Sequence, residues 1–332
     1  MSQDMSTAPR TEHARQLKGR SFSDMLRLLA PHAILVVVVA VTLIAAPGYR
    51  SSTQIASLLQ LMALLGVVAI GQNFVILIAG IDLSVGAVMT MTNLVTAQVM
   101  LGSNSNFPKA LAMALVIGLL AGAANGLGVS LLHIPDMVMT LATMTVLLGA
   151  GYLVTGGVNK GSSAPGMVTF MTQRFAGILT GGVLLWVALG ILTIVVLRRT
   201  VLGMQVYAVG LSRRAAEASG VRVWVTVTVL YTVAGLTSAL AGLMLTGYIG
   251  SSYYGMGDPY QLSSIAAVVI GGTSIFGGIG GYGGTFSGVA TIVVLLSFLQ
   301  VVGLPEAGQQ IAYGVVLILM LLLFVRQNSR RS

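Results

Sequence analysis

The sequence predicts an all-α integral membrane protein with about ten transmembrane helices and both termini on the cytoplasmic side. Its 332 residues are 56% hydrophobic and only 8% charged, whereas a soluble domain carries about 25% charged residues. The mean hydropathy is +0.94. Ten apolar stretches, most of them near the ~20 residues that a helix needs to cross a bilayer, are joined by more polar segments.

The apolar stretches fill most of residues 29–326, which we predict to be one transmembrane domain. The predicted spans lie at about 29–46, 55–79, 83–101, 110–132, 136–154, 180–197, 223–246, 260–276, 285–302 and 309–325. The eighth is short and runs into glycines. With 42 glycines in the chain, neighbouring helices can approach one another closely. Residues 1–28 and 327–332 are predicted to be cytoplasmic tails, the first of them basic.

The positions of the basic residues predict the orientation. With the N-terminus inside, thirteen of the seventeen fall in cytoplasmic segments: Arg10, Arg15, Lys18, Arg20, Arg27, Arg198, Arg199, Arg213, Arg214, Arg222, Arg326, Arg330 and Arg331. Only Arg50, Lys109, Lys160 and Arg174 fall outside. Because cytoplasmic segments are enriched in Lys and Arg, this bias predicts an N-in/C-in topology. The net charge of +9 therefore reflects orientation in a bilayer, and no nucleic-acid partner is expected.

Between the second and third spans, Gly80 to Gly86 interrupts the apolar sequence with an acid, Asp82. A bare carboxylate is costly in hydrocarbon, so this break has to be buried in protein or placed at a helix end. Gly80 is expected to take the left-handed conformation that ends a helix, and Asp82 or Ser84 to cap the next one. Asp136, at another predicted helix start, is also expected to act as a cap.

The cytoplasmic loop 198–222 contains a short predicted helix, Ser212 to Gly220. Ser212 can cap its start and Gly220 can end it. A helix this short is marginal alone in water, so it has to pack on something. From the residues, two interpretations stay open: a helix resting on anionic lipid headgroups, or a knob that docks into a cytoplasmic protein.

The glycine-rich stretch from Ile270 to Gly288 is predicted to be a close-packed inner loop. It lacks the Lys and the strand–loop–helix context of a phosphate-binding loop. We expect no catalytic group and no metal site in this chain, because His13, His32 and His133 are scattered and there is no cysteine.

Neutral polar residues recur inside the spans. Each such residue more often bonds a neighbouring helix than lines a path. Together, amides and hydroxyls without fixed charge suit the passage of a neutral, hydroxyl-rich solute. The residues predicted to line this translocation path are Gln72, Asn73, Asp82, Ser84, Asn93 and Asn125.

Three motifs, in this order, resemble those of one family. They are Gly80-Ile81-Asp82-Leu83-Ser84-Val85-Gly86, then Tyr207-Ala208-Val209-Gly210 leading to Ala215-Ala216 and Ser219-Gly220, and then Ile265 to Ser274 followed by Gly277-Gly278. The family is the permease subunit of bacterial ABC importers for ribose, xylose, galactose and related monosaccharides. The resemblance covers roughly residues 30–325.

The resemblance implies the ABC importer permease fold and a multi-pass protein of the bacterial inner membrane. It implies two permeases, identical or paralogous, around a central path, with a periplasmic sugar-binding protein above and ATP-binding subunits below. ATP and Mg²⁺ would be bound by the ATP-binding subunit, so this chain needs no cofactor and is not itself an enzyme. The implied coupling helix, which docks into that subunit, consists of Ser212, Arg213, Arg214, Ala215, Ala216, Glu217, Ser219 and Gly220.

The chain departs from ribose-type relatives at two places. Ile279 and Gly281 stand where those relatives carry Lys and Arg, and Gln261 and Ser263 where they often carry Glu and Asp. Both departures lower the local charge, and the resemblance does not single out one sugar. Two alternatives to the importer subunit are a secondary carrier for a neutral polar solute, in which a coupling helix has no purpose, and a channel or membrane scaffold.

Overall fold

The computed structural model describes residues 29–156, 158–305, 307, 308, 311, 314 and 315. The regular structure of these residues is helical, apart from two isolated bridges, Ser162 to Ser251 and Phe175 to Leu179. The all-α prediction is therefore confirmed for the part of the chain that the structure describes.

The first described helical segment is Leu29–Ala45. It is followed by η1 (Pro47–Arg50), α2 (Ser52–Leu77), α3 (Val85–Met100), η2 (Asn104–Asn106), α4 (Phe107–Ser130), α5 (Asp136–Thr155), α6 (Pro165–Thr172), α7 (Gly181–Arg199), α8 (Val201–Leu211), α9 (Arg213–Ala218), α10 (Val223–Ile249), α11 (Asp258–Ile270) and α12 (Tyr282–Val301).

Among the described residues, six helices are long and apolar enough to cross a membrane: α2, η2 with α4, α5, α7, α10 and α12. Each coincides with a predicted span. The first, third and eighth predicted spans correspond to shorter helices, namely Leu29–Ala45, α3 and α11. The tenth, 309–325, lies almost wholly outside the described residues. The chain is thus a multi-pass membrane protein.

Local capping residues set several helix boundaries. The side chains of Ser51, Thr180 and Thr200 accept hydrogen bonds from backbone N–H groups in the first turns of α2, α7 and α8. Gly156 and Gly250, both with positive φ, follow α5 and α10. Such caps satisfy backbone groups that have no partner within the helix.

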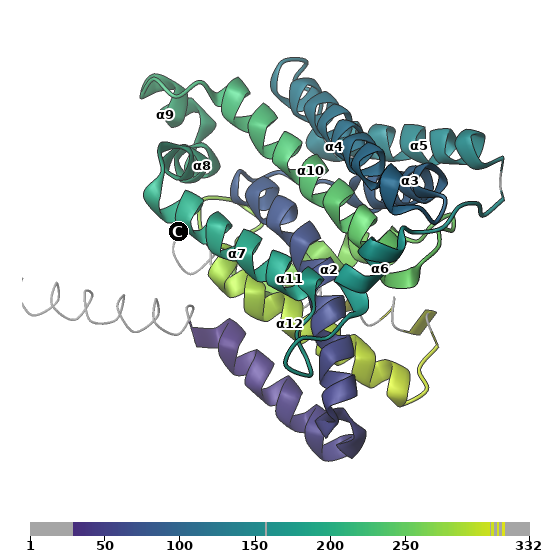
Figure 1. The fold of residues 1–332 in the computed structure, drawn as a ribbon. Helices are drawn as coiled ribbons and strands as arrows, with labels where there is room; N and C mark the ends of the chain where they lie inside the picture. Colours follow the sequence, from purple (N-terminus) through teal and green to yellow (C-terminus); the bar gives the residue numbers. More distant parts are fainter. Residues whose placement is uncertain (1–28, 157, 306, 309–310, 312–313, 316–332) are drawn as a thin grey trace, which may run out of the picture.

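Helix α10 crosses the middle of the helical assembly and packs against α2, α3 and, most extensively, α4 (Figure 1). Along α4, Gly118, Gly122 and Gly126 recur every fourth residue and face α10. A Cβ added at Gly122 would lie 2.4 Å from the carbonyl oxygen of Tyr231. This small-residue seam lets the two backbones touch, which is the usual basis of tight packing in membranes.

A second junction joins α2, α7 and α12. Trp186 Nε1 donates a hydrogen bond to Tyr282 Oη at 2.7 Å, and Tyr282 Oη donates to the carbonyl oxygen of Gly66 at 2.8 Å. The Trp186 ring also stacks on Phe286, with centroids 4.3 Å apart. Because Trp186 and Tyr282 are both fully buried, this junction holds α12 to its neighbours with paired polar groups.

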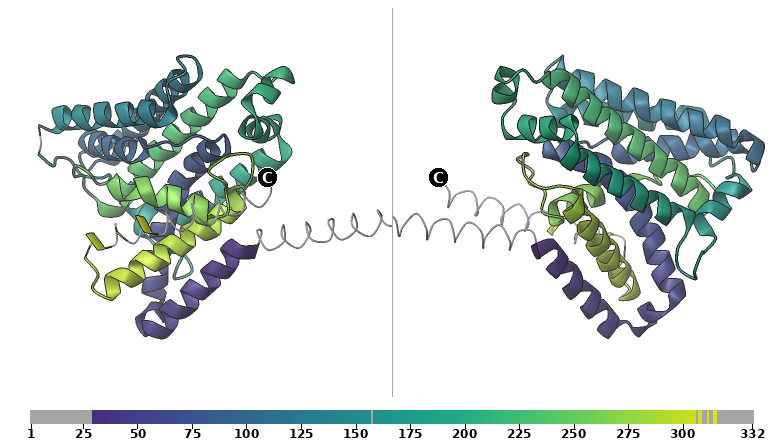
Figure 2. Two further views of the ribbon diagram at one scale, coloured as in Figure 1. Left: turned by 180° about the vertical axis from the view of Figure 1, so that it is seen from behind. Right: turned by 60° about the vertical axis from the view of Figure 1, so that its left-hand side comes forward.

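Helices α8 and α9 stand out at one end of the assembly, beside the start of α10 (Figures 1 and 2). The sequence predicted one short helix within loop 198–222. The structure has two, because Thr200 caps a second helix, α8, before Ser212 caps α9. The segment Leu29–Ala45 runs along α12, where His32 Nδ1 and Ser287 Oγ are 2.6 Å apart.

Candidate functional site

The predicted Ser212–Gly220 helix is present as α9. Ala215 N–H donates to Ser212 Oγ at 3.2 Å, and Gly220 takes a φ of +85° after the helix end. Ala216 is buried in a hydrophobic cluster with residues of α8 and α10, among them Val209 and Val223. The other residues of this segment are exposed. The segment is thus anchored by one small side chain and presents Arg213, Arg214 and Glu217 to the outside.

Helix α8 joins α9 to what we call the glycine-rich loop, residues 271–281. Tyr207 Oη donates to the carbonyl oxygen of Gly280 at 2.9 Å. The pKa of the Tyr207 phenol is raised, because the effect of burial outweighs the opposing effect of the Arg198 charge. The Gly278 N–H donates to the carbonyl oxygen of Leu77, the last residue of α2, also at 2.9 Å. Helices α8 and α9, this loop and the end of α2 meet in one region. We call this region the α9 end.

Glycines let backbones touch at the α9 end. A Cβ added at Gly210 in α8 would lie 1.9 Å from the carbonyl oxygen of Leu77 and 2.6 Å from the backbone nitrogen of Gly278. One added at Gly277 would meet the backbone of Ala79 at 2.8 Å. The close packing predicted for this glycine-rich stretch is confirmed, and only residues without a side chain fit it.

The connection between α2 and α3 differs from its prediction. The residue with positive φ is Ala79, at +59°, and not Gly80. Gly80 is needed for another reason, because a Cβ there would lie 2.7 Å from Tyr231 Oη. Ser84 is the residue before α3, but its side chain makes no capping hydrogen bond to the helix. Instead, Asp82 Oδ1 accepts from Ser84 N–H at 2.8 Å.

Asp136, in the first turn of α5, binds a neighbouring segment. Its Oδ2 accepts a hydrogen bond from Ile81 N–H at 2.6 Å. The prediction that Asp136 caps α5 was therefore wrong: Pro135 is the residue before the helix, no side chain caps it, and the partner of Asp136 lies 55 residues away in the α2–α3 connection. A charge-assisted bond of this kind fixes the connection to α5.

Three of the predicted path residues form one chain of hydrogen bonds. Thr143 Oγ1 donates to Asn125 Oδ1 at 2.5 Å, and Asn125 Nδ2 donates to Ser84 Oγ at 2.9 Å. Ser84 Oγ in turn donates to Asp82 Oδ1 at 2.6 Å. The chain links α3, α4 and α5 through the α2–α3 connection and satisfies the buried carboxylate.

The other predicted path residues lie elsewhere. Asn73 Nδ2 donates to both Thr273 Oγ1 and Thr285 Oγ1 at 2.9 Å, which ties α2 to the glycine-rich loop and to α12. Asn93 Nδ2 donates to Thr246 Oγ1 at 2.9 Å. The Gln72 amide has no hydrogen-bond partner among the described residues. All six predicted path residues are buried within this chain.

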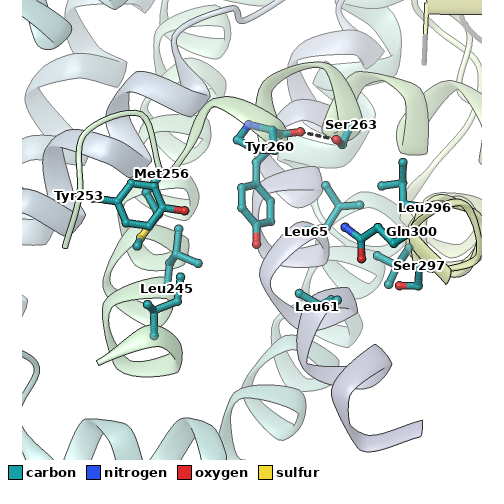
Figure 3. Close-up of a pocket in the computed structure, with 13 residues that line it drawn as sticks. Leu61, Leu65, Leu245, Tyr253, Met256, Tyr260, Ser263, Leu296, Ser297 and Gln300 are labelled. Atoms are coloured by element: carbon teal, nitrogen blue, oxygen red, sulfur yellow. Dashed lines mark hydrogen bonds between the residues drawn. The ribbon is translucent and has the colours of Figure 1, made fainter. Parts of the chain in front are cut away.

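A cavity of about 330 Å³ opens between α2, α10, α11 and α12 (Figure 3). We call it the four-helix pocket. Leu61, Leu65, Leu245 and Val293 contribute apolar lining. Its polar lining residues are Tyr253, Tyr260, Ser263, Ser297 and Gln300. The sequence had marked Ser263 as a departure from ribose-type relatives, but it carried no signal that would bring these residues together.

No group of three or more metal-ligating side chains occurs among the described residues.

The sequence was compared with known protein families and with curated proteins. Residues 54–326 match the model of a family described as the branched-chain amino acid transport system permease component. The chain belongs to this family. It is a transporter permease, and the predicted resemblance is confirmed.

Curated relatives cover nearly the whole permease. It is 35% identical to the ribose import permease protein of Bacillus subtilis, over 93% of this chain and 96% of that protein. It is 34% identical to the ribose import permease of Haemophilus influenzae, over 87% and 90%. It is also 34% identical to the fructose import permease of Rhizobium meliloti, over 87% and 84%. No solved structure matches the permease significantly.

Proposed function

We propose that this permease is the transmembrane subunit of an ATP-driven importer that carries a monosaccharide across the bacterial inner membrane. The observation that carries the proposal is the similarity to ribose and fructose import permeases over 87–93% of the chain. This similarity favours an importer subunit over a secondary carrier or a channel, neither of which needs an exposed helix such as α9.

The proposed topology has ten spans with both termini in the cytoplasm. Leu29–Ala45, α3 and α11 supply the shorter spans, and 309–325 is the tenth. The distribution of Lys and Arg supports this orientation. The α9 end then faces the cytoplasm, and the start of α2 faces the periplasm. The partners are an ATP-binding subunit that holds ATP and Mg²⁺, a periplasmic sugar-binding protein and a second permease subunit.

The α9 segment is the proposed docking point for the ATP-binding subunit. Arg213 and Arg214 offer two exposed cations, and Leu211 nearby is 70% exposed. A mixed surface of this kind suits a partner that combines an apolar pocket with acidic groups. Ala216 keeps the segment attached to the membrane domain.

Movement of α9 would pass to the membrane helices through α8 and the glycine-rich loop. Tyr207 bonds Gly280, and Gly278 bonds Leu77, so α8, the loop and α2 are joined by direct contacts. Backbone atoms already in contact cannot be compressed, so a push on α9 moves these segments as a unit. In this way closure of the ATP-binding subunits would open or close the path between the permeases.

Charge reversal on α9 tests this function. The double variant Arg213→Glu, Arg214→Glu is expected to lose the co-purifying ATP-binding subunit and ATP-driven uptake of labelled ribose and fructose, in cells that express the complete importer. Arg174→Glu is the matched control, because Arg174 is also exposed but lies in a predicted periplasmic segment. Uptake that persists in the double variant without a bound ATP-binding subunit would refute the proposal and favour a secondary carrier.

A further inference from the structure

The four-helix pocket lies at the opposite end of the assembly from α9. Leu61 and Leu65 lie near the middle of α2, Leu245 in the last turns of α10, and Gln300 in the last turn of α12. The start of α11 forms another wall, and α11 leads at its far end into the glycine-rich loop. Helices α11 and α12 therefore connect the pocket to the loop that contacts α8.

Among the described residues, the lining of the pocket is mostly apolar, with five polar side chains and no charged one. The thirteen lining residues that the structure describes include two phenols, two serine hydroxyls and one amide, and none of the thirteen is Asp, Glu, Lys, Arg or His. These groups can replace the water around sugar hydroxyls, since each can donate or accept a hydrogen bond. They cannot compensate for the lost hydration of a charged ligand. A sugar phosphate or an amino acid zwitterion is therefore a poor occupant.

The size and shape of the pocket suit a single sugar ring. A volume of about 330 Å³ is at the small end of the range of ~300–1,000 Å³ for ligand pockets. Figure 3 shows Tyr260 extending from the start of α11 into the space between α10 and α2. Tyr253 lies nearer α10, and Gln300 lies on α12. Aromatic rings offer apolar faces to the C–H groups of a sugar, while their hydroxyls remain polar.

We propose that the four-helix pocket binds one neutral monosaccharide within the membrane domain, between its release by the periplasmic binding protein and its passage to the cytoplasm. The proposal rests on the proposed importer function and names residues that contact its substrate. It also distinguishes between two sources of similarity: the family description refers to branched-chain amino acids, whereas the curated relatives import sugars. The uncharged lining favours sugars.

The test uses the complete importer, with its ATP-binding subunit and binding protein, in proteoliposomes. The double variant Ser263→Ala, Gln300→Leu removes two hydrogen-bonding groups from the pocket. The maximal uptake rate of the sugar carried best among labelled ribose, fructose, xylose and galactose is expected to fall about tenfold, in line with two lost hydrogen bonds. The half-saturating concentration of sugar is expected to stay the same, because the binding protein captures the sugar first.

Two controls isolate the pocket. Gln173→Leu removes an exposed amide just after α6 and is expected to leave uptake unchanged. Basal ATP hydrolysis and co-purification of the ATP-binding subunit are expected to be intact in the double variant. If the double variant does not assemble, Gln300→Leu alone serves, because Gln300 is exposed and is not needed for packing.

The possible failures can be told apart. Sugar uptake by the double variant equal to that of the Gln173→Leu control refutes the pocket but leaves the importer function standing. Uptake of labelled leucine by the unaltered importer, without uptake of any of the four sugars, refutes both. Loss of sugar uptake together with loss of basal ATP hydrolysis in Gln300→Leu assigns the residue to assembly and overturns the binding role.

Discussion

The two ends of the molecule are built differently. At the α9 end, backbones meet through glycines, and a Cβ at Gly210 would lie 1.9 Å from a carbonyl oxygen. At the opposite end, α2, α10, α11 and α12 are held apart by larger side chains around a cavity of about 330 Å³. The first arrangement transmits displacement with little give, whereas the second has room to change its volume. The difference teaches that one fold can combine a stiff mechanical junction with an adaptable pocket, joined by α11 and α12.

The most severe test of the stiff junction is Gly210→Ala. The added methyl group would overlap the Leu77 carbonyl, so α8 has to move away from α2 and the glycine-rich loop. We expect uptake to be abolished and the free energy of unfolding in detergent to fall by about 1–3 kcal/mol, as for overpacked cores. Gly283→Ala is the matched control, because nothing lies within 4 Å of a Cβ at Gly283. Equal uptake by the two variants would show that the junction is not tight.

Asp136→Ala tests how the α2–α3 connection, which begins at the α9 end, is held in place. Removing the carboxylate leaves Ile81 N–H without its acceptor. A hydrogen bond to a charged group contributes about 1.5–3 kcal/mol, so we expect a loss of stability of that size and reduced uptake. Asp136→Asn keeps an acceptor oxygen and is expected to be milder. Thermal unfolding in detergent measures both, and an asparagine variant as unstable as the alanine variant would contradict the assigned contact.

Tyr282→Phe tests the anchoring of α12, which carries part of the pocket at its far end. The change removes the acceptor for Trp186 Nε1–H and the donor to the Gly66 carbonyl. Buried groups without partners cost about 1–3 kcal/mol, so stability is expected to fall within that range. Tyr152→Phe on α5, where the ring is exposed, is the control. A Tyr282→Phe protein as stable as this control would show that the junction contributes nothing.

Tyr207→Phe is expected to have the smallest effect. It removes one hydrogen bond, from the phenol to the Gly280 carbonyl, that joins α8 to the glycine-rich loop. Stability should fall by only about 0.5–1.5 kcal/mol. If α8 transmits movement, the number of ATP molecules hydrolysed per sugar imported is expected to rise, although the free energy of unfolding changes little. An unchanged ratio in proteoliposomes would limit Tyr207 to a packing role.

Much of the helical framework could be predicted from local features. The apolar runs located α2, α4, α5, α7, α10 and α12, and the pair Ser212 and Gly220 located α9. Helix α8 was missed although Thr200 caps it, because its basic flanks suggested a loop. Gly80 was assigned the positive φ that Ala79 adopts, because sequence favours glycine there; in the structure Gly80 instead leaves room for the Tyr231 hydroxyl.

The sequence by itself determined the membrane class, the six long apolar helices, the family and the capped α9, because apolar length and caps depend on residues within one or two turns of each other. Only the tertiary structure decided that Asp136 binds Ile81 N–H, that Gly210 touches Leu77 and that four helices enclose a pocket. The physical reason is that these helices are apolar on every side. Without a polar face to orient them, which faces meet is decided by close packing and by the few hydrogen bonds between distant segments.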